Sequence, residues 1–348
     1  MNAFEYASPA SVAEAVRALA GKNGASALGG GTDLLNRIKE GVTSPSRVVA
    51  TRSIGDLAGV EQTPKAIIIK GATTLAALIK SEPTTKWLPG LRQAALEVGT
   101  PQIRNMATVA GNLLQRPRDW YYRNGFGLLG GKKVNGDTVR ELEGEFAPID
   151  TDEGTHLVRV GDNRYGAIYM TDGDALYVNT SSLAPPLIAL GARATLSGPD
   201  GERTVDVADL YRVPKSADEI ELALKPGEVL TKVIIPTPVA KNATYEVRHK
   251  QAHDWPLVLA SVALTTEGDT VRSAKVVLGS VAPVPLHCQP AVDAILGKAI
   301  TPETAAAAGK AAAAGAKPLS MNAYKVKLVE VAVKRALLAA AGNRYWEV

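Results

Sequence analysis

One glycine-rich stretch has the residue types of an anion-binding loop, and it reads Gly29-Gly30-Gly31-Thr32-Asp33. Residues without a Cβ atom let the backbone take positive φ and bring its amide hydrogens close to a ligand. The apolar residues of 34–40 have helical spacing, so Thr32 or Asp33 is the expected N-cap, and a helix N-terminus attracts anions. The stretch therefore predicts a phosphate site; the alternative is a glycine turn that binds no ligand.

A second stretch of small residues, Thr108-Val109-Ala110-Gly111-Asn112, is flanked by apolar residues and predicts a tight, irregular turn. Together with the first loop it would supply a second set of backbone donors, so the two loops could hold a pyrophosphate from both sides. Neither loop fits the pattern G-x-G-x-x-G, and a Rossmann dinucleotide site is therefore not expected.

Residues that commonly bind metals or act as nucleophiles are sparse. Cys288 is the single cysteine, which excludes an internal disulfide and any iron–sulfur cluster held by several thiolates of this chain. His249 and His253 are four apart, a spacing that suits a metal on a helix, whereas residues 245–249 have a strand pattern. We expect no metal site and no catalytic residue in this chain.

The elements around the first loop predict a small parallel α/β unit. A helix is expected to begin at the capping box formed by Ser11 and Glu14 and to end at Gly21. Strands are expected at 25–28, 47–50 and 67–70, with a short helix after the glycine loop. Further helices are expected from Thr73 or Thr74 onward and over 91–98.

The second half of the chain predicts an α+β layer. A helix over 182–192 and a hairpin turning at 198–201 precede a domain boundary expected near residue 226. Beyond it, strand patterns at 229–235, 245–249, 257–264 and 271–278 come before helices that begin after Pro302 and span 322–341. This order predicts a largely antiparallel sheet with helices on one face.

Residues 119–181 form a loop-rich insertion that is rich in Trp and Tyr. Long loops of this kind are more often functional than idle. The aromatic side chains either form a surface for a partner, because Trp, Tyr and Arg are favoured at interfaces, or pack inward around the loop itself.

The composition is that of a soluble globular protein with two or three domains, because the 348 residues are 46% hydrophobic and 21% charged. The net charge of +4 is small and scattered, so no nucleic acid is expected as a partner. No run of about 18 apolar residues occurs, so we expect no membrane span and a cytoplasmic location.

With both loops in view, the chain resembles the FAD-binding (medium) subunits of molybdenum hydroxylases, the family that includes xanthine dehydrogenase, aldehyde oxidoreductase and carbon monoxide dehydrogenase. The resemblance covers essentially the whole length. The segments that carry it are Gly30-Gly31-Thr32-Asp33-Leu34, Thr108-Val109-Ala110-Gly111-Asn112-Leu113, Ser181-Ser182-Leu183-Ala184 and Pro318-Leu319-Ser320-Met321-Asn322-Ala323-Tyr324-Lys325.

The resemblance implies an α+β fold: an FAD-binding domain of the vanillyl-alcohol oxidase type over 1–226, with subdomains of about 1–56 and 57–226, and a C-terminal domain over 227–348. It places the FAD pyrophosphate between the two loops and the flavin ring between the two domains. Carried over by motif position, the cofactor-binding residues are Leu28, Gly29, Gly30, Gly31, Thr32, Asp33, Thr108, Gly111, Asn112, Leu114 and Ser182.

The chain departs from the family pattern in three respects. One branch of the family has a cysteine where Asp119 stands and another near Ala175, as ligands of a [4Fe-4S] cluster, so we expect no such cluster here. Ser182 replaces the usual aspartate, which removes a polar contact, and Ala110 replaces a glycine, which restricts φ at that turn.

In the family, substrate reacts at a molybdenum cofactor on a large subunit, and [2Fe-2S] clusters of a small subunit pass the electrons to the FAD. The resemblance thus implies an electron-transfer subunit of a heteromeric oxidoreductase, with a dimer of heterotrimers as the expected arrangement. Two alternatives stay open at this point: a stand-alone FAD-dependent oxidase of the same fold, and a structural subunit that has lost FAD. The acceptor, whether NAD, dioxygen or a quinone, and the substrate of the large subunit stay open as well.

Overall fold

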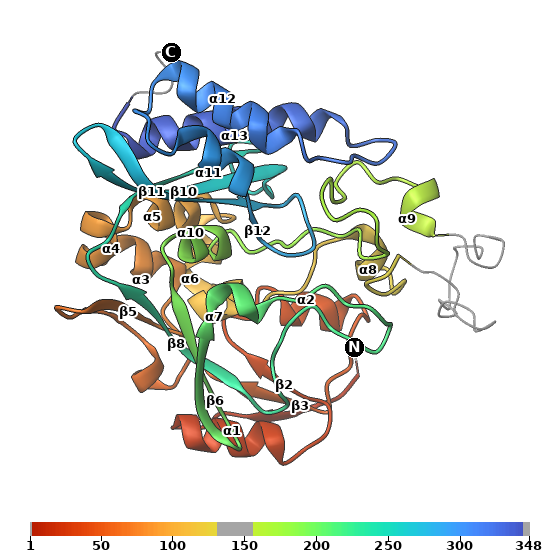
Figure 1. Cartoon of the computed structure of the whole chain (residues 1–348). Helices are drawn as coiled ribbons and strands as arrows, with labels where there is room; N and C mark the ends of the chain where they lie inside the picture. The colour runs from red at the N-terminus through yellow and green to blue at the C-terminus, as the bar shows by residue number, and fades with distance from the viewer. Residues whose placement is uncertain (1, 131–155, 344–348) are drawn as a thin grey trace.

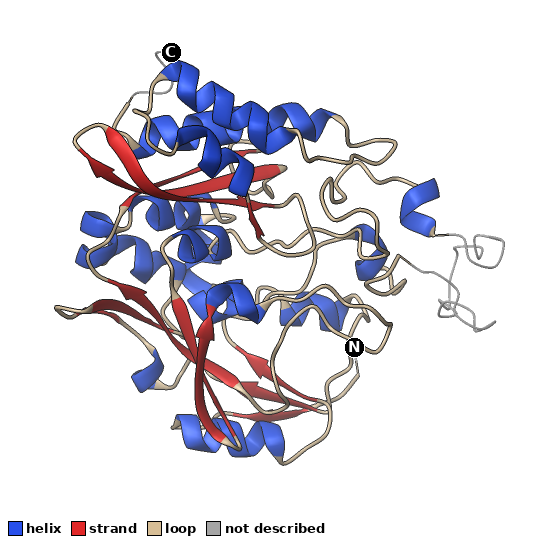
Figure 2. Ribbon diagram, viewed as in Figure 1, coloured by secondary structure: helices blue, strands red, loops and turns tan. Residues whose placement is uncertain are grey.

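The computed structural model describes residues 2–130 and 156–343. The secondary structure is arranged in layers, from helix α1 at the bottom of Figure 1 to helices α12 and α13 at the top. Figure 2 shows a layer of short helices between the lower strands and an upper sheet. Within the described residues, none of the helices combines the length and the apolar character that crossing a membrane requires.

The N-terminal unit is a three-stranded parallel sheet with the order β1-β3-β2, which confirms the predicted parallel pairing of 25–28 with 47–50. The expectation that 67–70 belongs to this unit is wrong, because that strand pairs antiparallel in a second sheet. Helix α1 begins as expected, because the Ser11 hydroxyl accepts a hydrogen bond from the Glu14 amide. The elements are β1 (Glu5–Ala7), α1 (Val12–Ala20), β2 (Ala25–Leu28), α2 (Leu34–Lys39) and β3 (Arg47–Ala50), followed by the 3-10 turn η1 (Gly55–Leu57).

A five-stranded antiparallel sheet follows, with the order β4-β5-β8-β6-β7. Its strands are β4 (Val60–Gln62), β5 (Ala66–Lys70), β6 (Arg193–Gly198), β7 (Gly201–Asp206) and β8 (Val229–Pro236), with the 3-10 turn η2 (Val207–Leu210) after β7. The expectation that β8 opens the C-terminal sheet is wrong, because β8 lies between β5 and β6. The domain division stays a prediction, and this pairing favours a limit after Pro236 over one at residue 226.

Six short helices lie between the five-stranded sheet and the C-terminal sheet, and the second of the two predicted loops leads into one of them, α7. They are α3 (Leu75–Lys80), α4 (Glu82–Trp87), α5 (Pro89–Glu97), α6 (Pro101–Met106), α7 (Val109–Leu113) and α10 (Ala184–Ala189). Thr74 caps α3 as predicted, through a hydrogen bond from the Ala77 amide to its hydroxyl. The short helix α10 takes Pro185 and Pro186 in its first turn, where a missing N–H costs nothing.

The C-terminal sheet has the strand order β12-β11-β10-β9, and its antiparallel pairing was predicted from the sequence. Its strands are β9 (Lys241–Val247), β10 (Val258–Glu267), β11 (Thr270–Gly279) and β12 (Leu286–His287), and its helices are α11 (Gln289–Ile295), α12 (Pro302–Ala313) and α13 (Tyr324–Ala340). These helices cover one face, and α5 and α10 pack against the other, so residues 258–264 of β10 are buried throughout. The two domains therefore share a core, to which Ala263 and Val277 belong.

The insertion contains two described helices, α8 (Trp120–Arg123) and α9 (Leu157–Val160), and its residues 131–155 lie outside the described part of the chain. Tyr121 packs with Leu157, Val158 and Leu176 in a small separate core. The inward-packing alternative holds for four tyrosines, which are buried, whereas Trp120 and Tyr165 are 59% and 57% exposed, and the partner surface stays a prediction. The buried tyrosines are Tyr121, Tyr122, Tyr169 and Tyr177.

Candidate functional site

The two predicted loops lie directly against each other. A Cβ atom on Gly29 would be 2.7 Å from the Thr108 hydroxyl oxygen, and one on Gly30 would be 1.9 Å from the Met106 carbonyl oxygen. Of the three glycines only Gly31 has positive φ, at 77°. The triple glycine is thus needed mainly because the first loop packs on the backbone before α7, with one left-handed residue at its end.

The first loop has free backbone donors. The amide N–H groups of Gly29, Gly30, Gly31 and Thr32 donate to no acceptor within the described residues, and the loop leads into α2 with Asp33 as its N-cap. Free amides in front of a helix form an anion site, because their partial positive charges point the same way. The prediction that Asp33 precedes the helix is confirmed, although its side chain makes no capping hydrogen bond, and the phosphate site stays a prediction.

The second loop differs from its prediction, because residues 109–113 form helix α7 and not an irregular turn. The Thr108 hydroxyl accepts from the Gly111 amide at 3.1 Å, and the amides of Val109 and Ala110 donate to carbonyl oxygens of other segments, both at 2.9 Å. Ala110 is helical, so the expected restriction of φ does not arise. Because these amides already donate within the protein, the donor that this loop provides for a ligand is the Thr108 hydroxyl group.

Two cavities meet at these loops. The loop cavity, of about 410 Å³, lies between the glycine loop and residues 220–230; the interdomain cavity, of about 190 Å³, is lined by Ser182 and by Trp255 of the C-terminal domain. They share four lining residues, namely Thr32, Asp33, Gly111 and Gln115. A ligand with phosphates at the shared residues could extend a group into each cavity.

The predicted site residues divide between these cavities. Asn112 and Ser182 line the interdomain cavity, while Leu28 lines neither and uses its carbonyl oxygen to accept from Thr51 at 2.9 Å. The others line the loop cavity; they are Gly29, Gly30, Gly31, Thr32, Asp33, Thr108, Gly111 and Leu114.

Asn112 connects α7 to the start of α10. Its Oδ1 atom accepts from the Ser181 hydroxyl at 2.9 Å and from the Leu183 amide at 3.2 Å. Its Nδ2 group has no acceptor within the described residues, so it stays available as a donor at the cavity. The segment that contains Ser181 and Leu183 is therefore held beside α7 by the Asn112 side chain, and not by backbone contacts alone.

Ser182 is 4% exposed and lies beside Glu246 of β9. Burial raises the pKa of the Glu246 carboxyl to about 8, and the Ser182 hydroxyl opposes part of this rise. The carboxyl is therefore neutral at neutral pH, which places a proton-bearing group behind the wall of the interdomain cavity.

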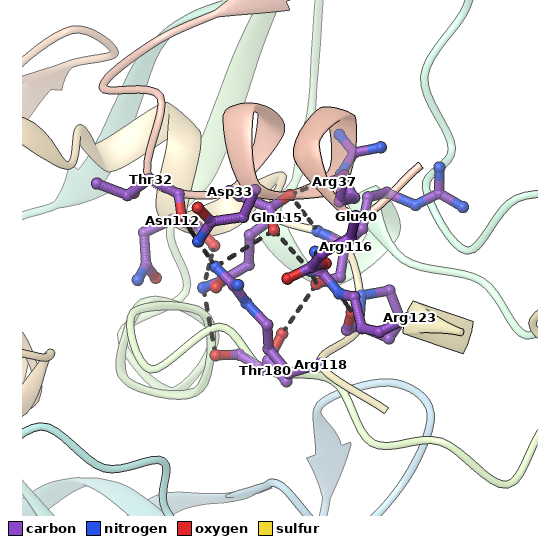
Figure 3. Close-up of polar contacts among 12 residues, drawn as sticks. Thr32, Asp33, Arg37, Glu40, Asn112, Gln115, Arg116, Arg118, Arg123 and Thr180 are labelled. Atoms are coloured by element: carbon purple, nitrogen blue, oxygen red, sulfur yellow. Dashed lines mark hydrogen bonds and ion pairs between the residues drawn. The ribbon is translucent and has the colours of Figure 1, made fainter. Parts of the chain in front are cut away.

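Asp33 is the centre of an arginine cluster (Figure 3). Its carboxylate accepts from Arg37 Nε at 3.1 Å, from the Arg116 amide at 3.2 Å and from Arg123 Nη2 at 2.6 Å. Arg118 Nη2 lies 3.3 Å away. Burial would raise the pKa of Asp33, but the guanidinium charges outweigh it and hold the pKa below its ordinary value.

The charge of this cluster suits an anion. A carboxylate would repel a phosphate, but Asp33 is matched by Arg37, Arg118 and Arg123, and Arg116 pairs separately with Glu221. The sequence analysis did not predict a role for these arginines. The signal that could have found them is the density of Arg116, Arg118 and Arg123 within one short segment, close to the second loop in the sequence.

Arg118 stands between the loops and the C-terminal domain. Its Nη2 donates to the Thr32 carbonyl at 3.1 Å, and its guanidinium carbon lies 5.0 Å from the centre of the Trp255 ring. The Nε atom is buried and has no acceptor within the described residues. A buried guanidinium N–H without a partner indicates that a bound group supplies the acceptor.

The residues present fit a dinucleotide diphosphate better than a metal. Free amides, a threonine hydroxyl and guanidinium groups are donors for phosphate oxygens. Within residues 2–130 and 156–343, no three His, Cys, Asp or Glu side chains gather as a metal site would require. His253 has a φ of 54° in the β9–β10 loop, where it lines the interdomain cavity, and His249 contacts the Tyr165 ring.

The fold and the site together define a protein of the α+β class in which two cavities meet at a pair of loops whose donors suit a dinucleotide diphosphate. The sequence model described as "FAD binding domain in molybdopterin dehydrogenase" matches residues 2–238, and "CO dehydrogenase flavoprotein C-terminal domain" matches residues 243–340. The chain therefore belongs to the family of FAD-binding subunits of molybdopterin dehydrogenases, which confirms the resemblance found in the sequence.

Individual relatives agree over nearly their full lengths. The carbon monoxide dehydrogenase medium chain of Afipia carboxidovorans is 28% identical and covers 97% of this chain and 96% of its own. The aldehyde oxidoreductase FAD-binding subunit of Escherichia coli is 29% identical, with 95% and 96% covered. Among solved structures, the Cu,Mo-CO dehydrogenase in its cyanide-inactivated form has a TM-score of 0.72 at 26% identity and 98% coverage of both chains.

Proposed function

We propose that this chain binds FAD and is the electron-transfer subunit of a heteromeric molybdenum hydroxylase. The observation that carries the proposal is the row of free amides in the glycine loop, which lies at the junction of two cavities in a chain of this family. A diphosphate needs several donors converging on one place, and the junction offers them from two loops.

The chain would hold FAD in three parts. The amides of Gly30, Gly31 and Thr32, with the Thr108 hydroxyl, would bind the pyrophosphate. The loop cavity has apolar walls from Leu19, Ile220, Leu222 and Leu224, which suits the adenine end. The interdomain cavity, with Asn112, Ser182 and Trp255, would take the flavin end.

Asp33 would act chiefly through the arginines. Its carboxylate is occupied by guanidinium groups, so only its backbone amide is suited to contact a phosphate. Arg118 would form part of the wall of the FAD site, because it lines the interdomain cavity and its Nη2 donates to the Thr32 carbonyl oxygen. Leu28 would contribute only by placing the loop.

FAD supplies the redox chemistry when bound, because it takes up and releases electrons singly or in pairs. The residues of this chain bind it, orient it and limit the access of water. Glu246 holds a proton near Ser182, so this part of the wall of the interdomain cavity adds no negative charge. This arrangement favours a bound group that gains negative charge on reduction.

The partners in this proposal are a large subunit with a molybdenum cofactor and a small subunit with [2Fe-2S] clusters, arranged as a dimer of heterotrimers in the cytoplasm. The parallel β1–β3 unit and the five-stranded sheet are proposed as the two subdomains of a vanillyl-alcohol oxidase-type fold. We propose no [4Fe-4S] cluster, since Cys288 is the single cysteine and lies in the C-terminal domain.

The test is the visible spectrum of the chain purified with its partner subunits. We expect flavin absorption with close to one FAD per chain. A complex that assembles but stays colourless after FAD is added would contradict the proposal and favour a subunit that has lost its cofactor. Bound FAD in a chain that turns over a substrate without any partner would favour the stand-alone oxidase.

A further inference from the structure

A third cavity, of about 780 Å³, lies between the insertion and the C-terminal domain, and we call it the aromatic cavity. Its volume is in the range of about 300–1,000 Å³ that small-molecule sites occupy. Its walls are largely aromatic and aliphatic side chains, which are Trp120, Tyr121, Val158, Tyr165, Val178, Trp255, Pro256 and Leu257. Such walls suit a flat, apolar ring system.

The aromatic cavity adjoins the interdomain cavity. The two share Arg118, Asp254 and Trp255, so the Arg118 guanidinium stacked on the Trp255 ring is part of the wall between them. A molecule in the aromatic cavity would therefore lie next to whatever fills the interdomain cavity.

The acidic side chains at this cavity are already paired. Asp119 accepts from the Tyr122 amide, Asp162 pairs with Arg164, and Asp254 accepts from the amides of Lys250 and Trp255. The cavity therefore gains little negative potential from them. Arg118 Nε is the buried donor without a partner in the described protein, so a ligand with an oxygen acceptor is favoured.

Lys325 is a further basic residue at the wall, and its hydrogen bonds are satisfied within the protein. Its Nζ atom donates to three backbone carbonyl oxygens, those of Tyr165, Gly166 and Ser280, at 3.4, 3.1 and 2.7 Å. It is 1% exposed, so it shapes the cavity and does not reach out to a free phosphate.

A second dinucleotide is not what this cavity is built for. The two glycines at its wall have their amides in use, because Gly161 donates to the Leu157 carbonyl at 2.8 Å and Gly166 to the Asn163 carbonyl at 3.0 Å. A pyrophosphate would find no cluster of free amides here, in contrast to the glycine loop.

We propose that the aromatic cavity binds a planar, uncharged aromatic molecule with carbonyl oxygens, the chemistry of a quinone. The statement that this cavity lies beside a flavin rests on the proposed function. Quinone binding in the cavity does not depend on it. The aromatic rings supply the stacking surfaces, and Arg118 supplies a hydrogen bond to one carbonyl oxygen.

The experiment titrates 2,3-dimethyl-1,4-naphthoquinone into the assembled, oxidised complex by calorimetry, without an electron donor. We expect one site per chain and about tenfold weaker binding of 2,3-dimethylnaphthalene, which has the same rings without carbonyl oxygens. FAD content is measured in the same samples. Saturable quinone binding without FAD would overturn the proposed function only, whereas full FAD content without quinone binding would overturn this proposal.

Variants locate the site. Trp120→Ala and Tyr165→Ala change exposed wall residues and should each weaken quinone binding about tenfold. Val178→Trp should abolish it by filling the cavity. The matched controls Trp87→Ala and Tyr6→Ala change side chains that are 39% and 63% exposed and lie outside the three cavities, and they should bind as the wild type does. Binding that none of the wall variants alters, or NAD⁺ displacing the quinone from the wild type, would overturn the proposal.

Discussion

Arg123 Nη2 donates to the Asp33 carboxylate at 2.6 Å, across 90 residues of sequence. This ion pair joins the glycine loop to the insertion, and Arg118 joins the same carboxylate to the wall shared with the C-terminal domain. One buried aspartate thus positions segments from three parts of the chain. The site owes its shape to this network as much as to the glycines.

Asp33→Asn should destabilise the protein and loosen FAD. The Asp33 side chain is 12% exposed, and its loss of charge leaves three guanidinium groups without their common partner. Breaking a buried ion pair costs about 3–5 kcal/mol, so we expect a clear fall in the unfolding midpoint in urea. The control Asp200→Asn removes an 82% exposed carboxylate and should leave the midpoint unchanged. Equal midpoints for the two variants would contradict this role of Asp33.

Gly30→Ala should remove bound FAD. The added Cβ would meet the Met106 carbonyl oxygen at 1.9 Å, so the loop must move away from α7. Overpacking of this kind costs about 1–3 kcal/mol, and the displaced amides no longer converge on the pyrophosphate. FAD per chain after desalting is the measurement. Gly173→Ala is the control, since its Cβ would meet nothing within 4 Å, and wild-type FAD content in both variants would refute the loop assignment.

Thr108→Val separates a capping role from a ligand role. Losing the N-cap hydroxyl of α7 should cost about 1 kcal/mol of stability and should also weaken FAD binding. Thr301→Val is the matched control, because Thr301 caps α12 with the same geometry far from the cavities. We expect a similar loss of stability in both variants but weaker FAD binding in Thr108→Val alone. Equal FAD affinities in the two variants would show that Thr108 only caps α7 and does not bind the cofactor.

Glu246→Gln should make stability less dependent on pH. The pKa of Glu246 is raised from 4.5 to about 8, so between these values the folded chain holds a proton that the unfolded chain has lost. The free energy of unfolding therefore falls as pH rises through this window in the wild type. Glutamine cannot ionise, so the stability difference in favour of the variant should grow from pH 5 to pH 9 in urea melts. A difference that stays constant would contradict the raised pKa.

The sequence by itself determined the local elements and the family. Caps such as Ser11 and Thr74, the glycine loop before α2 and the period of the strands act within a few residues, where side-chain type decides the backbone. The parallel N-terminal unit and the antiparallel C-terminal sheet followed from such patterns. The family was recognised from short motifs that follow one another in a fixed order, and this order can be seen in the sequence without knowledge of the fold.

Tertiary structure alone decided which segments meet. Strand β8 has an apolar pattern that fits either sheet, and it was its pairing with β5 and β6 that assigned it. The reason for Gly29 and Gly30 became visible only when Thr108 and Met106 were found against them. Long-range contacts of this kind depend on how layers pack, and no local pattern encodes the partner of a strand, the charges around Asp33 or the volume left between an insertion and a sheet.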